Sequence, residues 1–160
     1  MRLFKKILNF LFLSALRCVL QRVKSCECYV NNQLYSRIGY GVLLFLAIGE
    51  EDNEYKCIKL AERIPQLRIF EDENGKMNYS LQKIKGEIMV IPNFTLYGDL
   101  KSSLRPDFSK AEKKERAKSL YERFVSELKY QGIKVAEGIF GAKMLIKIEN
   151  DGPVTFILEE

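Results

Sequence analysis

The feature that most constrains the fold is the continuous apolar run VLLFLAIG at residues 42–49. A strand with one face in water alternates apolar and polar residues, whereas a strand buried on both faces is apolar throughout. The run therefore predicts a central strand packed on both sides. With 160 residues and 47% hydrophobic content, the chain is long enough for one domain with a substantial core and too short for two comfortable ones.

Shorter patterned segments predict further strands around this run. Residues 17–23 alternate apolar and polar side chains, and residues 26–35 follow as a second strand. Residues 73–76, ENGK, contain the Asn-Gly pair typical of a tight hairpin turn. The remaining segments expected to form strands are 67–72, 87–94, 138–150 after a glycine-containing bend, and 154–160 after DGP.

Two helices are expected between the strands. Asp52 or Asn53 can cap the first, which should end near Arg63, just before Pro65. Its inner side would be formed by residues at helical spacing, namely Cys57, Ile58, Ala61 and Ile64. The second helix is predicted from about Ser109 to Tyr130. Six or seven strands with two main helices predict an α+β fold with a curved, barrel-like sheet.

The first sixteen residues differ from the rest of the chain. They combine a basic start with a largely apolar run from Ile7 to Leu16, which is about half of the roughly 20 apolar residues that a membrane-spanning helix needs. Three interpretations stay open: a dispensable tail or over-long gene model, a surface-lying helix, and a weak secretory signal. We expect residues 17–160 to form the domain, without stable membrane association.

The absence of histidine excludes whole classes of chemistry. Without an imidazole the chain has no serine–histidine relay, no histidine-ligated metal and no histidine general base. Of the four cysteines, only Cys26 and Cys28 form a close pair, and two thiols make an incomplete zinc site. We therefore expect free thiols, no metal site and no cofactor.

The net charge of +5 permits binding to a polyanion but does not require it. Part of this charge belongs to the basic start of the chain. The lysine-rich beginning of the second helix is better interpreted as a solvated helix face than as a nucleic-acid patch.

Three segments carry residues unusual for a purely structural role. Pro92 has no N–H for a sheet ladder, so the strand 87–94 should lose its pairing there and direct Asn93, Phe94 and Thr95 elsewhere. Thr95 has no neighbouring base that could activate it as a nucleophile. In GIFGA, Phe140 lies between glycines that permit close approach to a ligand. Both phenylalanines could stack a nucleobase, and core packing is the alternative for each.

The third segment, NDGPVT, places Gly152 and Pro153 between two predicted strands. On the residues alone, a tight turn with a trans bond is preferred, since only about 5–6% of bonds before proline are cis. Together the three segments predict an α+β domain with a candidate nucleotide pocket.

Several motifs in the same order resemble the D-aminoacyl-tRNA deacylase family over about residues 17–160. They are RCVLQRV, LRIFEDENGKMNYSL, FTLYGD, RPDF, GIFGAKM and NDGPVT. The resemblance implies a cytoplasmic homodimer of barrel-like α+β subunits with tRNA as partner. It implies hydrolysis of the ester that joins a D-amino acid, or glycine mischarged on tRNA-Ala, to the terminal adenosine. In this family the tRNA 2′-hydroxyl is thought to assist the attacking water.

The resemblance also assigns roles to residues. Gly152 and Pro153 match a Gly-cis-Pro pair that reaches into the partner subunit's pocket and rejects L side chains. The residues implied to contact or support the substrate are Phe140 and Gly141 at the adenosine, Ala111 through its backbone, Lys101 and Arg105 at acceptor-end phosphates, and Arg22 as a brace for the Gly-Pro loop.

The catalytic tetrad is the place where this chain departs from the family. The family's Ser-Gln-Phe-Thr is here Pro92-Asn93-Phe94-Thr95, so a serine hydroxyl is lost and the amide is one methylene shorter. Two outcomes remain open. The pocket hydrolyses D-aminoacyl-tRNA with an altered rate or relaxed rejection of L-amino acids, or the protein is a non-catalytic tRNA-binding relative.

Overall fold

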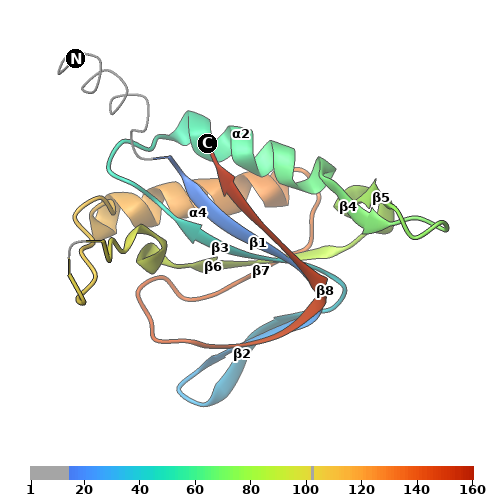
Figure 1. The fold of residues 1–160 in the computed structure, drawn as a ribbon, viewed down its shortest axis with the longest axis horizontal. Coiled ribbons are helices and arrows are strands. Elements are labelled where there is room, and N and C mark those ends of the chain that lie inside the picture. Colours follow the sequence, from blue (N-terminus) through green and yellow to red (C-terminus); the bar gives the residue numbers. More distant parts are fainter. Residues whose placement is uncertain (1–14, 102) are drawn as a thin grey trace.

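The computed structural model describes residues 15–101 and 103–160, and Figure 1 shows how their helices and strands are arranged. Residues 1–14 lie outside the described ranges. The three interpretations of the N-terminal extension therefore stay predictions. A six-stranded sheet forms the centre of the fold. Its strands are β1 (Arg17–Val30), β2 (Gln33–Ile38), β3 (Gly41–Ala47), β6 (Glu87–Pro92), β7 (Val135–Glu137) and β8 (Leu145–Glu159).

The long strand β1 organises the sheet because it pairs with three others. Its first half pairs antiparallel with β3, its second half with β2, and β8 runs antiparallel along most of its length. β6 is the parallel neighbour of β3, and β7 the parallel neighbour of β6. The Ser36 hydroxyl of β2 donates to the Glu137 carbonyl oxygen of β7 at 2.7 Å. The sheet thus curls into a nearly closed barrel, which confirms the predicted α+β fold class.

Two boundaries predicted inside the sheet are wrong. Segments 17–23 and 26–35 do not form separate strands: β1 continues to Val30, and the hairpin turn falls at Asn31 and Asn32, with φ of 50° and 62°. Asparagine tolerates this left-handed conformation, although Asn-Asn is a weaker turn signal than Asn-Gly.

The two final segments also belong to one strand, β8. Its pairing with β1 shifts register on either side of Val23, so the DGP sequence forms an irregularity within the strand instead of ending it.

The predicted Asn-Gly hairpin is confirmed between β4 (Arg68–Glu71) and β5 (Met77–Ser80). The Gly75 N–H donates to the Asp72 carbonyl oxygen at 2.9 Å, and Gly75 has the positive φ of 71° that such a turn requires. With this hairpin the described residues form eight strands, not six or seven. The three-residue β7 is too short to show an alternating pattern in the sequence.

The two main helices are present as α2 (Glu54–Arg63) and α4 (Lys114–Tyr130). α2 begins after Asn53, whose side chain accepts a hydrogen bond from the Lys56 N–H at 3.0 Å. α4 begins later than predicted because the chain before it pairs with the segment after β3, where the Glu112 N–H donates to the Ile48 carbonyl oxygen at 2.9 Å. The shorter helical elements are η1 (Ile64–Gln66), α3 (Leu81–Ile84) and η2 (Phe94–Tyr97).

The helices α2 and α4 pack against each other over one face of the sheet, as Figure 1 shows. In β3, Leu44 belongs to the core beneath these helices and Leu43 to a second core with Met89, which confirms that this apolar run is buried on both faces. On the inner side of α2, Leu60 is fully buried while Ile58 is only half-buried. Within the described ranges, no helix has the length and apolar character needed to cross a bilayer.

Candidate active site

A pocket of about 610 Å³ opens where the ends of β3 and β6 meet the beginning of α4 and the loop before β8. Most of its wall is aliphatic or aromatic. The side chains with polar groups on this wall are Asn93, Thr95, Glu112, Lys114 and Tyr121. A concave, mostly apolar surface with few polar groups is the usual form of a ligand site.

One wall of the pocket is the end of β6. Pro92 is the last residue of β6 in register with β3, and the Asn93 N–H still donates to the Leu46 carbonyl oxygen at 2.8 Å. The chain then turns into η2, in which the Gly98 N–H donates to the Thr95 carbonyl oxygen at 2.9 Å. The strand thus ends at Pro92 as predicted, but its backbone pairing with β3 extends one residue further, to the Asn93 N–H, before the chain leaves the ladder.

The Thr95 hydroxyl donates to the Asn93 side-chain oxygen at 2.5 Å. An amide oxygen is a weak base, so this contact orients the hydroxyl without activating it as a nucleophile. Phe94 is 58% exposed and lies edge-on to Phe108, with ring centroids 4.9 Å apart. This wall therefore presents an aromatic face and an oriented pair of polar groups.

Phe140 and Gly141 form a second wall. The Phe140 ring lies 5.8 Å from the Tyr121 ring, and the Tyr121 hydroxyl donates to the Val90 carbonyl oxygen at 2.8 Å. Burial raises the pKa of Tyr121, so its hydroxyl stays protonated as the donor in this bond. Gly141 has φ of +79°, a conformation that favours glycine. Phe140 is thus supported by a fixed aromatic ring.

Ala111 lines the same pocket from the segment before α4. It forms an antiparallel bridge with Gly49, just after β3. Of the predicted site residues, Pro92, Asn93, Phe94, Thr95, Ala111, Phe140 and Gly141 therefore meet in one pocket. They come from three parts of the sequence.

Gly152 and Pro153 lie elsewhere. They are exposed, do not line this pocket, and are joined by a cis peptide bond, not the trans bond preferred on the residues alone. Arg22 is only 3% exposed, and its Nε donates to the carbonyl oxygen of Asp151, the residue before Gly152, at 3.0 Å. Its Nη1 donates to the Ile69 carbonyl oxygen at 2.8 Å.

Lys101 and Arg105 also lie outside the pocket. Both are exposed in the loop between Asp99 and Asp107, whose backbones pair with each other at the base of that loop. These two side chains can therefore contact only those parts of a ligand that extend beyond the pocket.

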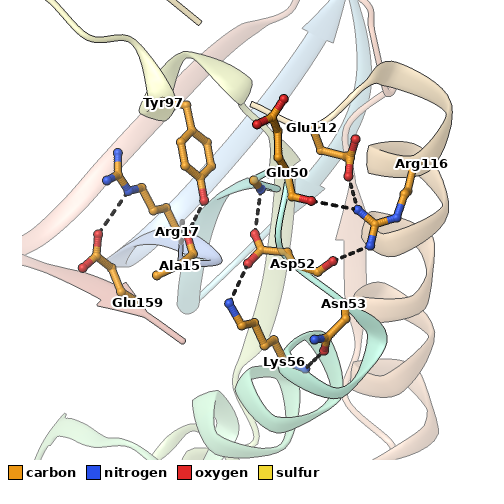
Figure 2. A network of polar contacts seen from close by, with 11 residues as sticks. Ala15, Arg17, Glu50, Asp52, Asn53, Lys56, Tyr97, Glu112, Arg116 and Glu159 are labelled. Carbon is orange, nitrogen blue, oxygen red and sulfur yellow. Dashed lines mark hydrogen bonds and ion pairs between the residues drawn. The ribbon is translucent and has the colours of Figure 1, made fainter. Parts of the chain in front are cut away.

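A polar network centred on the buried Asp52 includes Glu112 of the pocket wall (Figure 2). Asp52 is fully buried, and its carboxylate accepts hydrogen bonds from the Gly49 N–H at 2.6 Å and from Lys56 Nζ at 3.2 Å. Its carbonyl oxygen accepts from Arg116 Nη2 at 2.6 Å. Burial raises the pKa of Asp52. The network joins the segment after β3, which holds Ala111, to the first turns of α2 and α4.

Tyr97 anchors the end of η2 in the same region. Its hydroxyl donates to the Ala15 carbonyl oxygen, and the Arg17 guanidinium lies 4.7 Å from the centre of its ring. Arg17 also donates to the Leu96 carbonyl oxygen at 3.1 Å and pairs with Glu159 at 3.1 Å. Burial raises the pKa of Tyr97, with the nearby Asp52 charge as a second cause. The turn carrying Phe94 and Thr95 is therefore fixed at its far end.

Sequence reasoning missed several residues of the site and its support: Lys114, Arg116, Tyr121, and Asp52 in any role beyond a helix cap. Tyr121 had a usable signal, since it lies four residues after Ala117 on the buried face of α4. Asp52 and Arg116 had none, because their contacts depend on how distant segments pack.

The fold is that of a D-amino acid tRNA deacylase. A solved structure titled as a probable eukaryotic D-amino acid tRNA deacylase matches it with a TM-score of 0.81, at 20% identity, over 92% of this chain and 100% of that one. The D-Tyr-tRNA(Tyr) deacylase family model matches residues 19–159, and the chain belongs to this family.

Named relatives agree with this assignment. D-aminoacyl-tRNA deacylases from Persephonella marina and Aquifex aeolicus are 50% and 48% identical to this chain. The alignments cover 88% and 90% of this chain, and 95% and 97% of those relatives. A solved structure of a c-Myc DNA Unwinding Element Binding Protein is 36% identical, with a TM-score of 0.84 over 90% of this chain and 98% of that one.

Proposed function

We propose that the protein is a hydrolase that cleaves the ester bond of D-aminoacyl-tRNA in the cytoplasm. The observation that carries this proposal is the pocket itself. In a chain of this family, the end of β6, the Ala111 segment and the Phe140–Gly141 loop converge on one cavity large enough for an aminoacylated nucleoside. Relatives from Persephonella marina and Aquifex aeolicus carry the name of this activity.

The adenosine end of the substrate fits the Phe140 wall. Stacking of a base on an aromatic ring contributes about 1–3 kcal/mol, and Tyr121 supports Phe140 from behind. The ester would then extend toward the Asn93–Thr95 turn.

Catalysis in this pocket depends on positioning. The Thr95 hydroxyl is bonded to an amide, so it orients groups and does not attack. The 2′-hydroxyl of the terminal ribose assists the attacking water, and backbone dipoles around the Asn93–Thr95 turn stabilise the developing charge. A glycyl ester, which has no side chain, is accepted in the same way, including glycine mischarged on tRNA-Ala.

Selection against L-amino acids requires a second copy of the chain. Gly152 and Pro153 are exposed and outside the pocket of their own subunit, so they can act only on a neighbouring one. Arg22 holds the preceding residue in place. In the homodimer, the carbonyl groups of this pair would clash with an L side chain and leave space for a D side chain or a hydrogen atom.

The direct test uses purified protein with D-Tyr-tRNA, Gly-tRNA and L-Tyr-tRNA. We expect rapid release of D-tyrosine and glycine and slow release of L-tyrosine. Phe140→Ala should weaken adenosine binding and slow the release of all three amino acids, and its melting temperature reports on its fold. Equal turnover of the D and L esters would remove the proposed chiral selection, and no turnover of any ester would remove the hydrolase assignment.

A second candidate function is nucleic-acid binding without turnover. Two observations favour it: Pro92 and Asn93 replace the family's Ser-Gln, and one similar solved structure is named a c-Myc DNA Unwinding Element Binding Protein. Restoring Pro92→Ser with Asn93→Gln separates the two cases. If the wild-type protein is inactive and the double variant hydrolyses the ester, nucleic-acid binding without turnover is supported. If the wild-type protein is active and only its rate or its rejection of L-amino acids changes, the hydrolase is supported.

A further inference from the structure

The pocket wall carries two charged side chains, Glu112 and Lys114, and only one of the two charges is compensated. The Glu112 side chain is 8% exposed and pairs with Arg116. It also accepts a hydrogen bond from the Lys113 N–H at 2.7 Å. Lys114 has no hydrogen bond or ion pair with any residue in 15–101 or 103–160. Lys114 is thus an exposed positive charge at the edge of a largely apolar pocket, with no acidic partner among the described residues.

The position of Lys114 is defined by its contact with Gly141. Lys114 is the first residue of α4, and its side chain extends over the loop before β8. A Cβ built on Gly141 would lie 3.3 Å from Lys114 Cε and 3.6 Å from Nζ. The ammonium group therefore lies next to Gly141, the residue after the ring proposed to stack the terminal base.

We infer that Lys114 binds the phosphodiester on the 5′ side of the terminal adenosine of tRNA. The inference rests on the proposed function, because it assumes the adenosine stacked on Phe140. An aminoacylated terminal adenosine carries two charges, the ammonium of the amino acid and this phosphate. A lysine repels the first and attracts the second as a compact charge with three donors.

The geometry separates this contact from those of Lys101 and Arg105. Those two side chains lie in the 99–107 loop outside the pocket, so they can meet only phosphates farther along the acceptor strand. Lys114 lies at the pocket edge and is placed for the first phosphate. It is a substrate-binding residue that positions the adenosine and takes no part in bond cleavage.

A binding role predicts a specific kinetic pattern. Lys114→Met should raise KM and leave kcat nearly unchanged, because the phosphate contact is the same in the ground and transition states. It should also reduce the salt dependence of tRNA binding by about 0.7 in the slope of log K against log salt, the value for one single-strand phosphate contact.

The deciding experiment measures binding of two non-hydrolysable analogues by calorimetry. Both are 3′-amide analogues of D-tyrosyl-adenosine, and only one carries a 5′-phosphate methyl ester. The variants are wild type, Lys114→Met, and Lys118→Met as a matched control. Lys118 lies one turn along the same helix, does not line the pocket and pairs with Glu122 at 3.6 Å. The melting temperature of each variant reports on its fold.

We expect wild type and Lys118→Met to bind the phosphate-bearing analogue about tenfold more tightly. Lys114→Met should lose this preference, and Lys114→Arg should recover part of it. If Lys114→Met keeps the preference, or loses affinity for both analogues equally, the phosphate contact is wrong while the proposed function stands. If wild type binds neither analogue, the proposed function fails together with this inference.

Discussion

The pocket and the Gly152–Pro153 region are both proposed to act on one ester, but they are built differently. The pocket is lined by four segments of a single chain and is supported by the Asp52 and Tyr97 contacts. The Gly152–Pro153 pair is exposed, and the contacts that hold it come mainly from Arg22 and Asn150. Under the proposed function, substrate binding would therefore depend on one subunit, whereas chiral selection would depend on a second one.

The largest effects are expected from two variants, one that damages the Gly152–Pro153 pair and one that damages the pocket. Gly152→Ala should abolish the selective site, since its Cβ would lie 2.6 Å from Val154 Cγ2 at a φ of +147°. Phe140→Ala should weaken adenosine binding in the same chain. Each homodimer should therefore lose most of the excess of D-Tyr-tRNA over L-Tyr-tRNA hydrolysis, Gly152→Ala because it no longer rejects the L ester and Phe140→Ala because it binds neither ester well.

Co-expression of the two variants tests whether the regions act across the interface. Half of the dimers would be mixed, and one of their two sites would be intact, so about a quarter of the wild-type excess of D-Tyr-tRNA over L-Tyr-tRNA hydrolysis should return. If the loop served the pocket of its own chain, both sites of the mixed dimer would be damaged. No recovery would then be seen, and the proposed division of labour would be wrong.

The next largest effect concerns the support behind the pocket. Asp52→Ala would remove the buried carboxylate that accepts hydrogen bonds from the Gly49 N–H and from Lys56 Nζ. We expect the free energy of unfolding to fall by about 3 kcal/mol, as urea denaturation would measure. Asp107→Ala, which removes an exposed carboxylate of the 99–107 loop, is the control and should show no comparable loss. Similar losses of unfolding free energy in both variants would mean that the buried contacts of Asp52 contribute little to stability.

A smaller effect is expected for Arg22, which holds the residue before Gly152. Arg22→Lys keeps the charge but cannot reach the carbonyl oxygens of Asp151 and Ile69 together. Loss of one such hydrogen bond should destabilise the protein by about 1–2 kcal/mol and narrow the ratio of D-Tyr-tRNA to L-Tyr-tRNA hydrolysis. Arg68→Lys, on the exposed side of β4, is the matched control. A loss of adenosine-analogue affinity in Arg22→Lys would contradict the separation of the two regions.

The smallest effect is a pH dependence. Because burial raises the pKa of Asp52 in the folded state, that state holds the proton more tightly than the unfolded chain does. The stabilisation that Asp52 gains from holding this proton is fully present below 3.8, the ordinary pKa of an aspartate. It is lost as the pH rises through the higher pKa of the folded state. Urea unfolding of wild type and Asp52→Asn across this window should show wild type losing stability relative to the variant. The opposite trend would indicate that the pairing with Lys56 outweighs burial.

Local patterns in the sequence predicted the parts of the fold that depend on local physics. The apolar run 42–49, the Asn53 cap and the end of β6 at Pro92 each follow from side-chain chemistry within a few residues. Errors arose where pairing overrode local signals. β1 and β8 continue through segments interpreted as breaks, because each has a long partner strand that keeps it extended.

The candidate site was predictable to a similar degree. Motif resemblance brought Thr95, Ala111 and Phe140 together, and composition excluded a histidine-based mechanism. Lys114 could not be found this way, because in a lysine-rich helix start nothing marks one lysine as facing a pocket. Its relation to Gly141 exists only after α4 and the loop before β8 have packed.

The strand β1 has a further consequence. Arg17 and Arg22 both project from it, one to the turn that carries Thr95 and the other to the residue before Gly152. They lie five positions apart, so they leave the strand on opposite sides. β1 therefore sets the distance between the contacts that hold the Thr95 turn and the residue before Gly152. A shift of one residue in the pairing of β1 would move both arginine side chains to the other face of the strand at once, so one register fixes both contacts.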